Sequence, residues 1–154
     1  MKTVYLGLGS NIPKRERNIQ KAIDKLQEVA GLDVIDVSTM INTKAVSTMT
    51  QPEYLNGVIA IKTILTPKEL LELTQQIEID MGRDSKGTGD PRTIDIDILF
   101  YGEDIICEEG LDIPHPLLHE REFVLIPLNE IAPGLIHPVL QESISSICTR
   151  VIGY

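Results

Sequence analysis

The order in which two kinds of hydrophobic spacing follow one another constrains the fold of this chain more than any other feature of its sequence. Some segments are rich in β-branched residues, as strands are, whereas others repeat apolar residues every three or four positions, as amphipathic helices do. In chain order the expected elements are a strand at 3–9, a helix around 19–30, strands at 32–43 and 54–65, a helix at 66–82 and a strand at 93–102. This β-α-β-β-α-β order predicts an α+β fold of the ferredoxin-like kind, an antiparallel sheet with both helices packed on one face.

The expected elements also carry signals for their ends. The first strand closes on glycines and is expected to run into a tight turn. In the second helix Thr66 can cap the N-terminus, Pro67 suits the first turn and Glu69 completes a capping box. The first helix is expected to end before Gly31, after an apolar face of Ile19, Ala22, Ile23, Leu26, Val29 and Ala30. The Pro-rich C-terminal remainder is expected to form short helices and loops against the sheet edge.

Composition limits the kinds of protein that this chain can be. Its 154 residues, 42% hydrophobic and 24% charged, are sufficient for one domain, 1–154, with a real core. A net charge of −9 argues against a general nucleic-acid or anionic-membrane binder. We find no secretory signal, no apolar run of membrane-spanning length, and two cysteines without metal or disulfide spacing. The sequence therefore predicts a cytoplasmic protein that binds neither nucleic acid nor membrane, and we expect a monomer.

Two aspartates stand one residue apart in the last expected strand. Because successive side chains of a strand point to opposite faces, Asp95 and Asp97 share one face while Ile94, Ile96 and Ile98 share the buried one. Carboxylates about 6 to 7 Å apart repel each other, and a hard cation such as Mg²⁺ would relieve the repulsion. Two solvated aspartates on a wet face are the alternative interpretation, and it would be preferred for such a pair alone.

The residues before this strand favour the metal interpretation. Arg83, Lys86 and Arg92 lie in a short glycine-containing segment that ends at the aspartates. Arginine holds phosphate oxygens bidentately, lysine acts as a point charge, and a loop that carries both could close over a nucleotide. Each residue taken singly is a surface charge, but together with the aspartates they favour phosphoryl transfer.

Two further features are compatible with ligand binding. Tyr54 and Asn56 alternate as the aspartates do, and a ring beside an amide could bind a planar heterocycle, although a half-buried Tyr with an edge-strand Asn explains them equally well. His115 lies between two prolines and is either a phosphate donor or a turn residue. His119 and His137 are interpreted as structural.

Four stretches, "YLGLGSN", "QPEYLNGV", "PRTIDIDILFYG" and "HPLLHEREFVLIPLNEIAP", together resemble the 6-hydroxymethyl-7,8-dihydropterin pyrophosphokinases of the folate pathway in order and spacing, over nearly the whole chain. The resemblance implies a ferredoxin-like α/β fold. It also implies transfer of the β,γ-diphosphate of ATP to the hydroxymethyl group of the pterin, with release of AMP. Two alternatives remain open: a nucleotidyltransferase of the polymerase-β kind, which would release pyrophosphate, and a non-catalytic ferredoxin-like domain that binds a small ligand.

The same resemblance implies a role for individual residues. Asp95 and Asp97 resemble the ligands of two Mg²⁺ ions, and with Arg83 and Arg92 they form the expected catalytic set. The expected ATP contacts are Gln75, Glu78, Arg83, Lys86, Arg92, Ile98, His115 and Arg121. The expected pterin contacts are the rings of Tyr54 and Phe123, the side chain of Asn56, and backbone groups of Thr43 and Val46.

The chain departs from the family pattern at two places. The stretch "DSKGTGDPR" is a residue shorter than in many members and lacks their tryptophan. Gly110 and Asp112 stand where some members have a basic residue and a threonine in the nucleotide site. We therefore expect weaker ATP contacts with activity retained.

Overall fold

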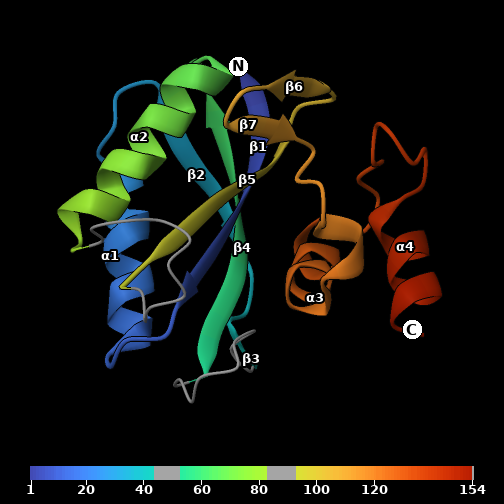
Figure 1. The fold of residues 1–154 in the computed structure, drawn as a ribbon, viewed down its shortest axis with the longest axis horizontal. Helices are drawn as coiled ribbons and strands as arrows, with labels where there is room; N and C mark the ends of the chain where they lie inside the picture. The colour runs from blue at the N-terminus through green and yellow to red at the C-terminus, as the bar shows by residue number, and fades with distance from the viewer. Residues whose placement is uncertain (44–52, 83–92, 154) are drawn as a thin grey trace.

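The structure of the protein, a computed structural model, describes residues 1–43, 53–82 and 93–153 (Figure 1). Its first elements are β1 (Lys2–Ser10), α1 (Arg15–Gln27), β2 (Leu32–Val37), β3 (Ile41–Thr43), β4 (Tyr54–Thr63) and α2 (Pro67–Asp80). They are followed by β5 (Asp95–Tyr101), β6 (Ile106–Glu108), β7 (Leu111–Ile113), a 3-10 turn (Leu118–Glu120), α3 (Glu122–Ile131) and α4 (Ile144–Val151). None of the helices described is long and apolar enough to cross a membrane.

The sheet has the strand order β2-β4-β1-β5, and β3 extends it by pairing with β4. The pairs β1–β4, β1–β5, β2–β4 and β3–β4 are all antiparallel. Strands β1 and β2 are joined through α1 but are separated in the sheet by β4, which is the split βαβ arrangement. The predicted ferredoxin-like α+β fold is therefore confirmed.

The two faces of the sheet are both covered by helices. Figure 1 shows α1 and α2 on one side and α3 and α4 on the other. The core under α1 and α2 takes alternate residues of the strands, including Leu6, Ile59 and Ile96. A second core joins Val58, Leu99 and Phe100 of β4 and β5 to residues of α3 and α4: Val124, Leu125, Leu128, Ile144, Ile147 and Cys148.

The position of the C-terminal helices differs from the sequence expectation. We expected short elements against the sheet edge, whereas α3 and α4 cover the face opposite α1 and α2 (Figure 1). The physical reason lies in β5, where the four residues 98–101 are all buried. A strand whose consecutive residues are all apolar needs cover on both faces.

The expected strand 32–43 is interrupted in the structure. The main chain of Ser38 donates to the carbonyl of Val58, and its hydroxyl accepts the N–H of the same residue. The next residue, Thr39, donates its N–H to the carboxylate of Glu130 on α3 at 2.8 Å. These contacts draw the chain toward α3, so β2 and β3 are separate strands.

Two elements, α1 and β1, end at other residues than the sequence predicts. Helix α1 ends at Gln27, before Val29 and Ala30, and Gly31 adopts φ 80° in the turn that follows. The first strand runs one residue past its expected end at Gly9, to Ser10. The capping box of α2 is confirmed, since the hydroxyl of Thr66 accepts the N–H of Glu69 and the carboxylate of Glu69 accepts the N–H of Thr66.

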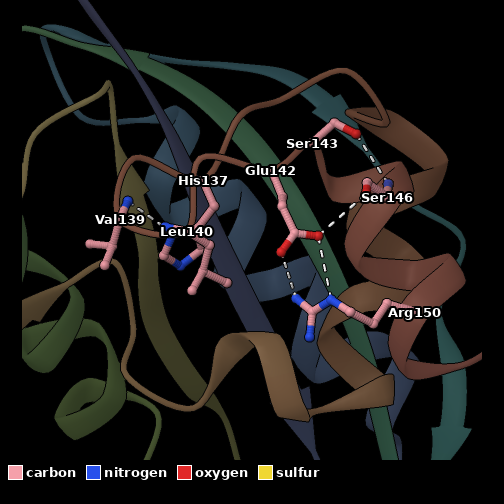
Figure 2. Close-up of polar contacts among 7 residues, drawn as sticks. All are labelled: His137, Val139, Leu140, Glu142, Ser143, Ser146 and Arg150. Carbon is pink, nitrogen blue, oxygen red and sulfur yellow. Dashed lines mark hydrogen bonds and ion pairs between the residues drawn. The ribbon is translucent and has the colours of Figure 1, made fainter.

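The loop before α4 closes around a buried histidine (Figure 2). Nδ1 of His137 accepts the N–H groups of Val139 and Leu140 at 3.2 and 3.1 Å. Farther along, Glu142 accepts from Arg150 at 2.9 Å, while Ser143 caps α4. His137 therefore has a structural role, in agreement with the interpretation from the sequence.

Candidate active site

Three strands bring the expected heterocycle contact and the expected metal ligands onto one face of the sheet. In the strand register Gly9 of β1 lies opposite Asn56 of β4 on one side and Asp95 of β5 on the other. Because cross-strand partners share a face, this row points away from α1 and α2. Two strand spacings separate its ends, so the backbones of Asn56 and Asp95 are about 10 Å apart. The row connects the expected heterocycle contact with the expected metal ligands.

The alternation predicted for the aspartates is confirmed. Ile94, Ile96 and Ile98 are at most 7% exposed and pack in the core under the helices. Asp95 and Asp97 are half-buried and lie on the opposite face. Farther along β5, Leu99 and Phe100 are covered by the C-terminal helices.

Glu78 of α2 is bonded to the strand that carries the aspartates. Its side chain is 3% exposed, and its Oε2 accepts the backbone N–H of Ile96 at 2.9 Å. Ile96 stands between the two aspartates, so this bond fixes the start of β5 from the helix side. Gln75, the other expected nucleotide residue on α2, is exposed.

The expected pterin residues of β3 and β4 lie together. Thr43 pairs with Tyr54 across the two strands, and Nδ2 of Asn56 donates to the Thr43 hydroxyl at 2.6 Å. Only backbone groups of Thr43 were expected to contribute, so this side-chain contact is an addition to the expected site. All three residues are half-buried, as residues at an open site are.

The expected residues after β7 lie near the second core. The guanidinium carbon of Arg121 is 5.6 Å from the centroid of the Phe123 ring, a cation–π distance, at the start of α3. His115 donates its backbone N–H to Leu99 of β5, and its Nδ1 accepts the N–H of Leu117 at 3.3 Å. Since Nδ1 is an acceptor, the neutral ring carries its proton on Nε2, which can donate to a phosphate.

Four expected site residues, Val46, Arg83, Lys86 and Arg92, lie outside the described residues. The residues expected at the site do not include Gly9, which the sequence places only at the end of the first expected strand, before a tight turn. The signal that could have found it is a glycine inside a β-prone run, since such a glycine often marks a close approach of another group.

The donor set at β5 fits a magnesium ion that keeps part of its water shell. Within the described part of the chain, no group of three or more His, Cys, Asp or Glu side chains could enclose a metal ion. Two carboxylates alone provide too few ligands for a closed site. Mg²⁺ is commonly bound by one or two carboxylates, with water and substrate phosphates completing its shell.

Comparison with known proteins decides the family. The sequence model described as 7,8-dihydro-6-hydroxymethylpterin-pyrophosphokinase (HPPK) matches residues 5–133. This chain belongs to the HPPK family. Curated HPPK relatives include one from Aquifex aeolicus, 44% identical over 92% of this chain and 88% of its own length. Another, from Bacillus subtilis, is 46% identical over 82% of this chain and 76% of its own length.

Longer proteins contain a similar segment. The Schizosaccharomyces pombe folic acid synthesis protein fol1 is 41% identical over 98% of this chain, which spans 21% of that protein. A crystal structure of wild-type Plasmodium falciparum HPPK-DHPS with pteroate gives a TM-score of 0.77 at 17% identity. It covers 97% of this chain, which spans 42% of the solved chain, and it shows the shared fold.

One departure from the HPPK pattern has a local structural explanation. Strands β6 and β7 pair Glu108 with Leu111, which leaves a two-residue turn. Gly110 adopts φ 77° in that turn, a conformation that favours glycine. Asp112 is exposed on β7.

Proposed function

We propose that this chain transfers the β,γ-diphosphate of ATP to the hydroxymethyl group of 6-hydroxymethyl-7,8-dihydropterin. The hydroxymethyl oxygen forms a bond to the β-phosphorus, the bond from that phosphorus to the oxygen it shares with the α-phosphate breaks, and AMP leaves. The hydroxyl proton passes to solvent. The observation that carries the proposal is the row of Asn56, Gly9 and Asp95, which joins a heterocycle contact and an acidic pair on one face.

On the phosphate side, the protein contributes charge and position. Asp95 and Asp97 would hold two Mg²⁺ ions, which when bound neutralise phosphate charge and acidify the hydroxyl group. Glu78 holds the strand between the two aspartates. His115 would donate from Nε2 to a phosphate oxygen. The remaining proposed contacts rest on the family pattern: Gln75, Arg83, Lys86, Arg92, Ile98 and Arg121.

On the pterin side, the rings of Tyr54 and Phe123 would stack on the two faces of the heterocycle. The carboxamide of Asn56, held by Thr43, would bind its hydrogen-bonding edge. Val46 completes the proposed contacts from the family pattern. The family match favours this reaction over the nucleotidyltransferase and the non-catalytic domain considered above. The cytoplasmic location and the monomeric state stay predictions.

A product assay tests the reaction. With ATP, Mg²⁺ and 6-hydroxymethyl-7,8-dihydropterin, the proposed enzyme forms AMP and the pterin diphosphate. Release of pyrophosphate would identify a nucleotidyltransferase. Binding of the pterin without any turnover of ATP would identify a non-catalytic domain.

Asp97→Ala tests the metal ligands. We expect kcat to fall by about 100-fold or more, the range seen when a charge-stabilising group is removed from an active site, with the unfolding midpoint retained. Asp33→Asn is a matched control, because Asp33 is an exposed aspartate on β2, the strand at the other end of the sheet from β5. Its cross-strand partner is Lys62 of β4. Near-normal AMP release by Asp97→Ala would refute the metal assignment.

A further inference from the structure

We propose that Gly9 is a positioning residue for pterin recognition, because its missing side chain leaves the space in which the carboxamide of Asn56 lies. This inference rests on the proposed function, since it concerns the same pterin contact. Gly9 occupies the middle of the row that connects Asn56 with Asp95.

The space above Gly9 is filled by its neighbours. A Cβ built on Gly9 would lie 2.7 Å from Oδ1 of Asn56 and 3.6 Å from Cδ1 of Tyr54. The first distance is shorter than van der Waals contact allows, so any side chain at position 9 must displace the carboxamide. Gly9 does not adopt the positive φ found at Gly31 and Gly110. Its backbone conformation is open to other residues, and lack of space is the reason for glycine here.

The carboxamide of Asn56 is confined from the other side as well. Its Nδ2 donates to the hydroxyl of Thr43 at 2.6 Å. A methyl group at position 9 pushes the far end of the side chain, so Asn56 rotates and this hydrogen bond is weakened. The displaced atom ends a flexible side chain, so the strand can accept the change without unfolding. The expected loss is therefore in ligand recognition and not in folding.

The chain provides a matched control on the same strand. Gly7 lies two residues before Gly9 and faces the same side of the sheet. A Cβ on Gly7 would meet the Leu99 side chain at 3.5 to 3.7 Å, which is ordinary van der Waals contact. Both Gly→Ala changes reduce the conformational entropy of the unfolded chain equally. Only the change at position 9 displaces a proposed ligand contact.

The experiment compares Gly9→Ala, Gly7→Ala, Asn56→Ala and the double variant Gly9→Ala/Asn56→Ala. Calorimetry measures the Kd of 6-hydroxymethylpterin in the presence of Mg²⁺ and a non-hydrolysable ATP analogue, and the Kd of the analogue alone. We expect Gly9→Ala to weaken pterin binding about tenfold, the effect of losing roughly one hydrogen bond. The Kd of the analogue should not increase, and the Tm should not fall. Gly7→Ala should change the pterin Kd less than about twofold.

The double variant separates positioning from a general disturbance. If Gly9 acts through Asn56, Gly9→Ala adds less than about twofold in the Asn56→Ala background. A full tenfold loss in that background would overturn the proposal, and so would a Gly9→Ala protein that binds the pterin as tightly as wild type.

A second measurement does not depend on the function. The side-chain amide resonances of Asn56 in the ligand-free protein should shift in Gly9→Ala and stay in place in Gly7→Ala. Unmoved resonances in Gly9→Ala would refute the positioning of Asn56, whatever the wild-type protein binds. A wild-type protein that binds no pterin would refute the proposed function and the recognition role with it, while a shifted resonance would still show that Gly9 orients Asn56.

Discussion

At the scale of single residues, Glu78 shows how a buried side chain on one side of a sheet can hold a strand whose functional residues lie on the other side. Its carboxylate reaches β5 from α2 and accepts the N–H that lies between Asp95 and Asp97. The position of Glu78 on its helix was visible in the sequence, but its partner was not. Position along a helix gives the direction of a side chain, whereas the strand it meets depends on packing.

His137 is the residue whose titration should affect stability. Burial lowers the pKa of His137, the neighbouring His119 lowers it further, and Glu142 acts in the opposite direction. The ring also packs edge-on against Phe100, with centroids 5.5 Å apart. A proton on Nδ1 would displace the two backbone N–H groups that this atom accepts (Figure 2).

We therefore predict a loss of stability as the pH falls below about 6.5, the pKa of an unperturbed histidine. The unfolded state takes up a proton there before the folded state does, so the free energy of unfolding decreases from that pH down to the lowered folded-state pKa. Urea unfolding at pH 7.5 and 5.5 measures this difference. His137→Gln, which does not titrate, should show a smaller difference, and an equal one would show that other groups are responsible.

At the scale of secondary structure, the elements that formed as expected are those whose signals are local. The capping box of α2 involves only residues 66–69, and the structure reproduces it. The break between β2 and β3 was not predictable in this way, because it depends on Glu130, about ninety residues from Thr39. The end of α1 moved for a related reason: Val29 packs against the core after the helix has ended.

The cap of α2 gives a prediction for that element. Thr66→Ala removes the acceptor for the N–H of Glu69 and should lower the free energy of unfolding by about 1 kcal/mol. Hydrogen bonds from the backbone and then the side chain of Thr66 to the carboxylate also lower the pKa of Glu69. The capping box therefore weakens as the pH falls from the ordinary pKa of a glutamate to this lowered one. Chemical denaturation at neutral pH measures the loss. Thr66→Ser keeps the hydroxyl and should lose little, and a Ser variant as unstable as Ala would contradict this explanation.

At the scale of the whole molecule, the two cores share strands of the sheet. Neighbouring residues of β4, Val58 and Ile59, belong to different cores, and so do Ile98 and Leu99 of β5. Loss of packing on one face should therefore destabilise the strands that the other face needs. The C-terminal helices are expected to unfold together with the rest of the protein.

Ile147→Ala and Leu70→Ala test this coupling. Both side chains are fully buried, one in α4 and the other in α2. Each change should cost about 2 to 5 kcal/mol, the usual range for such cavities. Unfolding followed by circular dichroism and by tyrosine fluorescence should give one coincident transition for both variants. Separate transitions in Ile147→Ala would show that the α3–α4 layer unfolds independently.

The sequence by itself determined the order of the elements, the cap of α2 and the opposite facing of Asp95 and Ile96. Each of these follows from residues a few positions apart, whose relation is set by the periods of strand and helix. Only the tertiary structure placed Asn56, Gly9 and Asp95 in one row and α3 and α4 on the second face. The row depends on the register of strands far apart in the sequence, and the covering of a face depends on packing. Spacing along the chain fixes neither of them.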